Sequence, residues 1–366
     1  MTKKETFIKE RGFRISNMSK LEARLASIEI GLESEDYNRV IEDLNKIKKE
    51  NPDYPLEKEG YLIDFYMGQA IFRKEISSKT KPKQLEKARQ HLKKSLESIS
   101  TFADGHLMQA YNSMVLGQIL NSEFYRLESK YEFQEALKIN PFLQNEVSPK
   151  ISALNQSIKQ DYDITICANN EEVILELMIE FEKFPWIKIE YGDITTQKAD
   201  AIVSPANSFG FMDGGLDHTL SEYFGWDLQE KLQKIIKEKH HGELLVGKAE
   251  ILETGNEEVP YLISAPTMRV PMEIKDSMNP YLATRAVFIA LEKFNSEEKR
   301  INSVLIPSMG TGIGKVPYDI SARQMRAAYE DILLNQNKFP QDFADAQHKN
   351  KVLSMDHFYQ LYKGQY

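Results

Sequence analysis

The sequence predicts a chain in two parts, an all-α helical domain followed by an α/β three-layer sandwich with a mixed sheet. From about residue 15 to 159, apolar residues recur at helical spacing, as at Leu21, Leu25 and Ile28. From Tyr162 onwards, short β-branched runs alternate with helical patterns, which is typical of a sheet covered by helices on both faces. We therefore divide the chain into an N-terminal extension at 1–14, the helical domain at 15–160, the sandwich at 161–336 and a C-terminal tail at 337–366.

Within the helical domain, a weak internal repeat links the stretches 44–52, 88–96 and 131–141. Proline dipeptides such as Asn140-Pro141 punctuate the pattern where helices are expected to end. The third stretch resembles the second helix of a tetratricopeptide repeat, although the stretches are spaced more widely than the ~34 residues of that repeat. The resemblance implies a degenerate, tetratricopeptide-like array that offers a groove or an end to a protein partner or to a second copy of the chain.

Within the sandwich, β-branched and apolar runs predict the strands and longer periodic segments predict the helices. The strands are expected at 164–168, 187–191, 201–203, 249–252, 261–263 and 304–306, and the helices at 216–240, 279–296 and 318–335.

Composition and charge exclude several classes of protein. The chain is 41% hydrophobic and 28% charged, which is ordinary globular usage. No apolar run approaches the ~18 residues that span a bilayer, so we expect no membrane partner. The single cysteine, Cys167, excludes an internal disulfide framework and fits the reducing cytoplasm. Residues 161–366 hold 21 Lys and Arg against 32 Asp and Glu, a net charge of −11 that argues against nucleic-acid binding there.

Three segments that follow predicted strands carry the chemistry. They are Asp193, the stretch from Ser204 to Asp217, and the loop from Ser308 to Gly314. Ligands of α/β folds collect at the carboxyl ends of strands, and a glycine loop that leads into a helix presents backbone N–H groups to phosphate. Two such loops on neighbouring strands can hold a diphosphate from both sides, while an Asp at a third strand end receives a base. The pattern predicts a site for an ADP-ribose-type nucleotide.

Four ordered blocks over roughly 162–335 resemble those of a macro domain. They are Gly192-Asp193-Ile194-Thr195, the stretch 199–207, Gly214-Gly215-Leu216-Asp217 and the stretch 306–314. The resemblance implies an α/β/α fold that binds ADP-ribose or a related nucleotide, and some members of the family hydrolyse ADP-ribosyl linkages. A related subgroup forms the sensor domain of effectors in some Thoeris phage-defence systems.

The resemblance also implies a role for each matched residue. Asp193 would accept a hydrogen bond from the adenine amino group, and Ile194 would donate its backbone N–H to a ring nitrogen. Asn207 would hold the distal ribose, and Asp217 stands where hydrolytic relatives carry a water-orienting carboxylate, so Asn207 and Asp217 are the candidate catalytic residues. The two phosphate loops would be lined by Gly214, Gly215 and Leu216, and by Ser308, Met309, Gly310, Thr311, Gly312, Ile313 and Gly314.

The chain departs from the family pattern at positions that weaken catalysis more than binding. Ser204 replaces an Asn, Ser221 replaces a His, and Gly314 replaces an aromatic residue that covers the distal ribose, which is expected to widen that end of the site. We therefore expect a nucleotide sensor whose helical domain mediates oligomer or partner contacts, without a required cofactor or metal. Two alternatives stay open: an ADP-ribosyl hydrolase, and a scaffold that recognises ADP-ribosylated partners.

Overall fold

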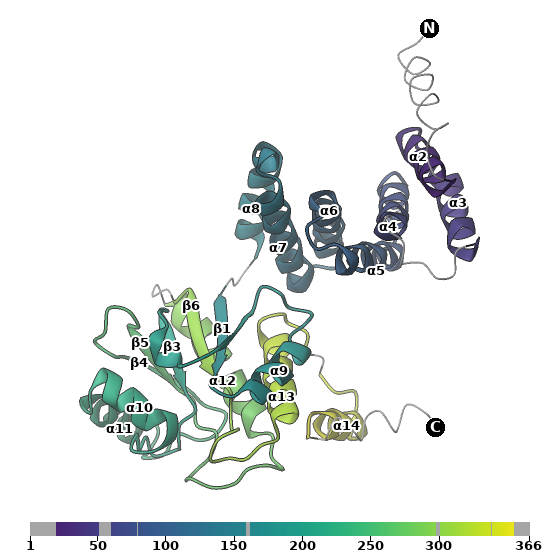
Figure 1. The fold of residues 1–366 in the computed structure, drawn as a ribbon. Coiled ribbons are helices and arrows are strands. Elements are labelled where there is room, and N and C mark those ends of the chain that lie inside the picture. Colours follow the sequence, from purple (N-terminus) through teal and green to yellow (C-terminus); the bar gives the residue numbers. More distant parts are fainter. Residues whose placement is uncertain are drawn as a thin grey trace. The chain divides into compact units, whose positions relative to one another are not determined.

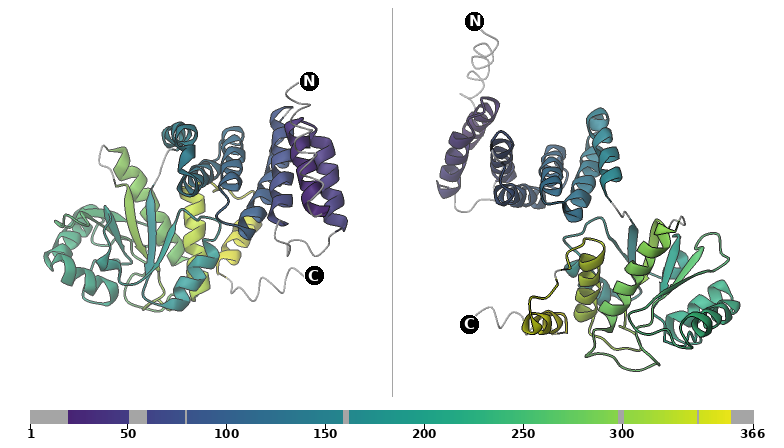
Figure 2. Two further views of the ribbon diagram at one scale, coloured as in Figure 1. Left: turned by 45° about the horizontal axis from the view of Figure 1, so that its top comes forward. Right: turned by 180° about the vertical axis from the view of Figure 1, so that it is seen from behind.

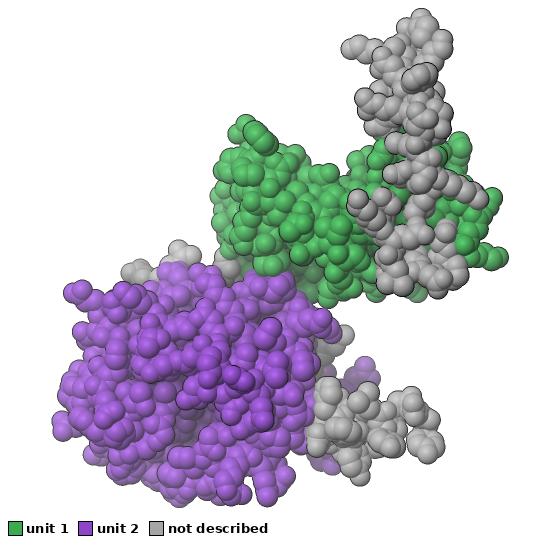
Figure 3. All heavy atoms as spheres, viewed as in Figure 1, with its two compact units in different colours: residues 1–158 green, residues 159–366 purple. Residues whose placement is uncertain are grey.

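The computed structural model describes residues 20–50, 60–78, 80–158, 162–297, 301–337 and 339–354. The chain forms two compact units, Met1–Ile158 and Lys159–Tyr366 (Figure 3). The predicted extension at 1–14 lies outside the described residues, as do residues 355–366 of the predicted tail. No helix within these described ranges is long and apolar enough to cross a bilayer.

The first unit is helical wherever it is described, as the sequence predicts (Figures 1 and 2). Each helix packs against the next one along the chain, which makes an array of antiparallel neighbours. Its elements are α2 (Lys20–Glu33), α3 (Tyr37–Glu50), α4 (Gly60–Ile76), α5 (Pro82–Ser98), α6 (Ala103–Ile119), α7 (Glu123–Ile139), the 3-10 turn η1 (Pro141–Leu143) and α8 (Gln144–Ser157). The relation of this array to tetratricopeptide repeats stays a prediction.

Close apolar packing and buried ion pairs hold the helices of this array together. Gly68 of α4 lies so near α5 that a Cβ on it would stand 2.6 Å from Leu92 Cγ. Arg89 of α5 reaches α7, where its Nε and Nη2 donate to Glu128 at 2.7 and 2.5 Å. Ser113 Oγ of α6 donates to the same carboxylate at 2.6 Å. Glu128 therefore joins three successive helices of the array.

The second unit is built on a six-stranded mixed sheet of order β2-β1-β6-β3-β5-β4. Its strands are β1 (Asp163–Ala168), β2 (Lys188–Tyr191), β3 (Ala201–Ser204), β4 (Glu250–Glu253), β5 (Tyr261–Ser264) and β6 (Ser303–Pro307). Neighbouring strands run parallel except for β4, which pairs antiparallel with β5 at one edge. The carboxyl ends of the parallel strands consequently meet along one edge of the sheet.

Helices cover both faces of this sheet, which confirms the predicted three-layer sandwich (Figure 1). On one face, Ile202, Leu262 and Leu305 of the sheet share a buried cluster with Leu232 and Ile236 of α11. The helices of this layer are α10 (Gly215–Phe224) and α11 (Asp227–Lys239), and those of the other layer are α9 (Glu171–Glu180), α12 (Asn279–Ser296) and α13 (Tyr318–Ile332).

Two segments differ from the sequence prediction or extend it. The single helix expected at 216–240 is interrupted at Gly225, whose φ of +99° ends α10 before α11 begins. Part of the predicted tail forms α14 (Phe343–Ser354), which packs against α13. Gln324 of α13 donates to the Leu353 carbonyl at 3.3 Å, and Lys349 donates to Asp331 at 2.9 Å.

Candidate functional site

A cavity of about 530 Å³ lies at the carboxyl edge of the sheet, where a ligand site is expected in such a fold. Its volume is in the range of small-molecule sites. The ends of β1, β2, β3, β5 and β6 all contribute to its wall. Their contributions are Cys167 and Ala168, Gly192 and Asp193, Pro205 to Asn207, Thr267 and Met268, and Pro307 and Ser308. Two loops that lead into helices complete the lining.

The first loop ends in Gly214, which caps the N-terminus of α10. A Cβ on Gly214 would meet nothing within 4 Å, and its φ of −147° is open to any residue. Neither packing nor backbone conformation therefore requires a glycine at this position. Gly214 lines the cavity, and the first N–H groups of α10, which have no partner within the helix, lie at the edge of the cavity.

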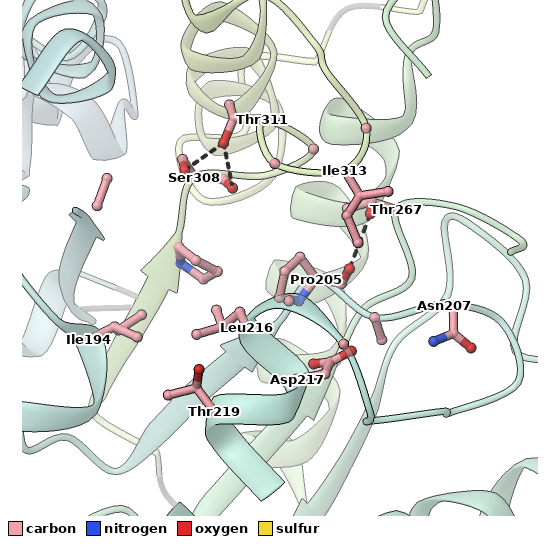
Figure 4. A pocket seen from close by; sticks show the side chains of 18 of the residues that line it. Ile194, Pro205, Asn207, Leu216, Asp217, Thr219, Thr267, Ser308, Thr311 and Ile313 are labelled. Atoms are coloured by element: carbon pink, nitrogen blue, oxygen red, sulfur yellow. Dashed lines mark hydrogen bonds between the residues drawn. The ribbon is translucent and has the colours of Figure 1, made fainter. Parts of the chain in front are cut away.

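The second loop, Ser308 to Gly314, follows β6, the strand that pairs with β3. Ser308 Oγ and Thr311 Oγ1 hydrogen-bond at 2.8 Å and brace its first turn. Gly312, like Gly214, would place a Cβ in open space. Ile313 reaches from this loop toward the other, since its Cδ1 lies 3.8 Å from where a Gly215 Cβ would stand. The two loops therefore flank the cavity from opposite sides (Figure 4).

Gly314 does not widen the cavity as its sequence position suggested. A Cβ on Gly314 would lie 2.5 Å from the Gly310 carbonyl oxygen and 2.7 Å from Ile274 Cγ1. Ile274 also donates its backbone N–H to the Gly314 carbonyl at 2.8 Å. The space beside Gly314 is filled by Ile274, so close packing explains the glycine here, and the expectation of a wider distal end is corrected.

At one end of the cavity, Asp193 caps a 3-10 turn, η2 (Ile194–Thr196). Its Oδ1 accepts hydrogen bonds from Thr195 N at 2.9 Å and from Thr195 Oγ1 at 2.8 Å. No hydrogen bond to Oδ2 is formed by the described residues, and the side chain is exposed at the cavity wall. Asp193 thus combines a structural role with an oxygen that is open to a ligand.

Asn207 lies at the other end of the cavity (Figure 4). Most of its amide is used to close its own loop. Its Oδ1 accepts from Phe209 N at 3.1 Å and from Phe211 N at 3.3 Å, and its Nδ2 donates to the Phe211 carbonyl at 2.7 Å. One Nδ2 hydrogen is left for a ligand. The predicted contact with a sugar is therefore limited to a single donor.

Asp217, in the first turn of α10, lies at the floor of the cavity and is 7% exposed. Ser204, buried at the end of β3, donates a short hydrogen bond to its Oδ1. Burial raises the pKa of Asp217 to about 7, and the Ser204 hydrogen bond lowers it only in part. Oδ2 makes no hydrogen bond with the described residues. A carboxyl of this kind can accept or donate a proton near neutral pH.

Sequence reasoning assigned no role to several residues that line the cavity. Asn169 follows β1, Thr219 lies on α10, and Thr267 follows β5, where its Oγ1 donates to the Pro205 carbonyl at 3.1 Å. Cys167, within the strand predicted at 164–168, is buried and also lines the cavity. Knowledge of the strand order would have identified these lining residues, because the order determines which strand ends lie next to one another at the cavity.

The charges of the cavity wall are all acidic. Its described lining residues include Asp193, Asp213 and Asp217 but no Lys, Arg or His. Arg269, which follows β5, is held outside the lining by Glu243, to which its Nε donates at 2.5 Å. A phosphate bound in this cavity would therefore be held by backbone N–H groups rather than by cationic side chains.

Comparisons with known proteins find similarity within the second unit. The Macro domain family model matches residues 203–325, which include both glycine loops. An uncharacterized protein of Aquifex aeolicus is 38% identical over 139 residues, which cover 38% of this chain and 78% of the relative. Macro domain-containing protein TTE0995 of Caldanaerobacter subterraneus is 30% identical over 149 residues, or 40% of this chain and 81% of the relative. Thermosipho africanus DarTG, solved in complex with ADP-ribose, is 17% identical with a TM-score of 0.33, over 52% of this chain and 57% of that one.

Proposed function

This chain belongs to the macro domain family, and we propose that its second unit binds ADP-ribose or a related ADP-ribose-derived nucleotide. The observation that carries the proposal is the pair of glycine loops on the neighbouring strands β3 and β6. Gly214 and Gly312 both line the cavity, and neither packing nor backbone conformation requires a glycine at either position. Backbone N–H groups at a helix N-terminus are suited to a diphosphate, and they need no cationic side chain.

The family resemblance implies one orientation of such a nucleotide in this cavity. The adenine would lie beside Asp193 and Ile194, with the free Oδ2 of Asp193 accepting from its amino group. The diphosphate would pass between the loops, beneath Ile313. The distal ribose would then reach Asn207 and Asp217, which lie away from Ile194 in the cavity (Figure 4).

We also propose that the helical unit reads out this binding as a change in self-association or in affinity for a protein partner. A tetratricopeptide-like array suits this role because it exposes surfaces on every repeat. The resemblance to sensor domains of phage defence supports an effector role, and the single cysteine supports a cytoplasmic location. A ligand can drive such a change only through different affinities for the two assembly states.

Calorimetric titration of the intact chain with ADP-ribose, followed by light scattering on the same samples, tests these proposals. Binding should be lost in Gly214→Val and Gly312→Val, because each places a side chain where the diphosphate would lie, while both variants keep the melting temperature of the wild type. Leu175→Val, on the exposed face of α9 and outside the lining, is the control and should bind normally. Full affinity in both glycine variants would refute the proposed site, and binding without any change in mass would refute a readout through self-association.

The Ser204–Asp217 pair favours a second candidate function, hydrolysis of ADP-ribosyl linkages. Asp217 lines the cavity with one oxygen free of the described residues, and its pKa of about 7 suits a general base. In this function Asp217→Asn would abolish release of ADP-ribose from a modified protein while sparing ADP-ribose affinity. Absence of turnover by the wild-type chain would eliminate it.

A further inference from the structure

We infer that the distal end of the cavity selects its ligand by charge: it accepts an ADP-ribose whose distal ribose carries a neutral or cationic group and rejects one that carries an anion. This inference rests on the proposed function and names the class of nucleotide that the site takes. It follows from the side chains that surround the position expected for the distal ribose.

No cationic side chain balances the carboxyl groups of this end among the described residues that line the cavity. Asp217 forms the floor with one oxygen free of the described residues, and Asp213 is exposed on the loop that precedes α10. Two basic side chains next to lining residues in the sequence already face carboxylates. His218, which follows Asp217, has its Nδ1 3.5 Å from Glu222, and Arg269, which follows Met268, forms an ion pair with Glu243. A phosphate or carboxylate beyond the distal ribose would thus meet two acidic groups.

The backbone N–H groups near this end are not available to bind such an anion. The N–H groups at the start of α10 and in the loop after β6 lie where the diphosphate would be bound. The Asn207 loop, which borders the distal end, already satisfies the N–H groups of Phe209 and Phe211 with the Asn207 side chain. Asn207 offers one remaining hydrogen, which is sufficient for a hydroxyl but not for a second phosphate.

The apolar rim of this end suits a flat substituent. Phe211 is 52% exposed and lines the cavity, and Ile313 of the opposite loop is 50% exposed. Both backbone polar groups of Phe211 are held by Asn207, so the ring projects from a fixed support. The face of an aromatic ring attracts cations and stacks on planar bases. A pyridinium ring, as in NAD⁺, combines the two properties.

Calorimetric titration of the full chain at pH 8 tests the inference with three probes: ADP-ribose, NAD⁺, and ADP-ribose with a phosphate on its distal C1″. We expect NAD⁺ to bind within about threefold of ADP-ribose or more tightly, and the phosphorylated probe to bind at least tenfold more weakly, a difference of about 1.4 kcal/mol. Asp213→Asn should reduce that tenfold gap at least threefold. Phe211→Ala should weaken NAD⁺ at least fivefold more than it weakens ADP-ribose, and both sites are exposed, so both variants should fold.

The outcomes separate this inference from the proposed function. If ADP-ribose binds and the phosphorylated probe binds as tightly, the selection by charge is wrong while the nucleotide site stands. If NAD⁺ is rejected more than tenfold, or if Phe211→Ala weakens both ligands equally, the rim does not receive the substituent and the inference fails. If ADP-ribose itself does not bind, the proposed function and this inference fall together.

Discussion

Replacing Asp217 by Asn should stabilise the second unit in a manner that depends on pH. Burial raises the pKa of this carboxyl from 3.8 to about 7, so the folded state holds a proton that the unfolded state has released. Stability should therefore fall by about 1.4 kcal/mol for each pH unit between about pH 4 and pH 7, and then level off. The full penalty is on the order of 4 kcal/mol. The amide of Asn does not ionise, so it carries none of this penalty, and its oxygen can still accept the hydrogen bond from Ser204.

Thermal unfolding of the full chain from pH 5 to pH 8 measures this difference. The advantage of Asp217→Asn over the wild type should grow by about 2–3 kcal/mol across the range, or on the order of 5–10 °C in the transition of this unit. Asp213→Asn makes the same chemical change on an exposed carboxyl and should show no such growth. Parallel curves for the wild type and Asp217→Asn would show that the buried carboxyl ionises normally, and the reasoning from its burial would be refuted.

Three other substitutions test the packing around the site and in the helical array. Gly314→Ala should destabilise the second unit by about 1–3 kcal/mol, seen as a lower melting temperature, because the added Cβ would overlap the Gly310 carbonyl oxygen. An unchanged melting temperature would contradict this packing argument. Arg89→Met should cost the first unit about 3–5 kcal/mol in urea unfolding, since it leaves Glu128 buried without its cation, whereas Arg39→Met at an exposed pair should cost less than about 1 kcal/mol. Asn207→Ala removes three loop hydrogen bonds and should weaken ADP-ribose at least tenfold in calorimetry; unchanged affinity would show that the loop holds its shape without them.

The layers of the second unit could be predicted from sequence because its strands are short β-branched runs between periodic helices. The break at Gly225 was missed because the apolar pattern continues on both sides of it, and only the backbone φ of +99° separates α10 from α11. The order of the strands was also beyond a local pattern, since it depends on contacts between distant segments. That order is what makes the strands of the two glycine loops neighbours, as the sequence argument required.

The parts of the site that are defined by backbone conformation could be predicted from the sequence. The parts that are defined by the direction of a side chain could be predicted less well. Asp193 and the glycines of both loops line the cavity at the ends of their strands, whereas Met309 is buried outside its lining, and the roles of these residues in binding stay predictions. The direction of a side chain depends on its local partners, so the sequence could not show that Asn207 closes its own loop or that Ser204 binds Asp217, thirteen residues away. For the same reason Gly314 suggested an open space that Ile274 fills.

The buried carboxyl and the cation-free wall have a joint consequence for binding. A diphosphate that enters this cavity adds negative charge beside Asp217, and this charge favours the protonated form of the carboxyl. At a pH where Asp217 is ionised in the ligand-free protein, binding must therefore be accompanied by proton uptake. ADP-ribose affinity should therefore fall as pH rises above about 7, by up to tenfold between pH 7 and pH 8.5, and calorimetry in buffers of different ionisation enthalpy should detect the proton. Asp217→Asn should bind with nearly constant affinity over the same range. A wild-type affinity that is equally constant would mean that the ligand does not approach this carboxyl, and Asp217 would then belong to the packing of α10 against β3 rather than to the nucleotide site.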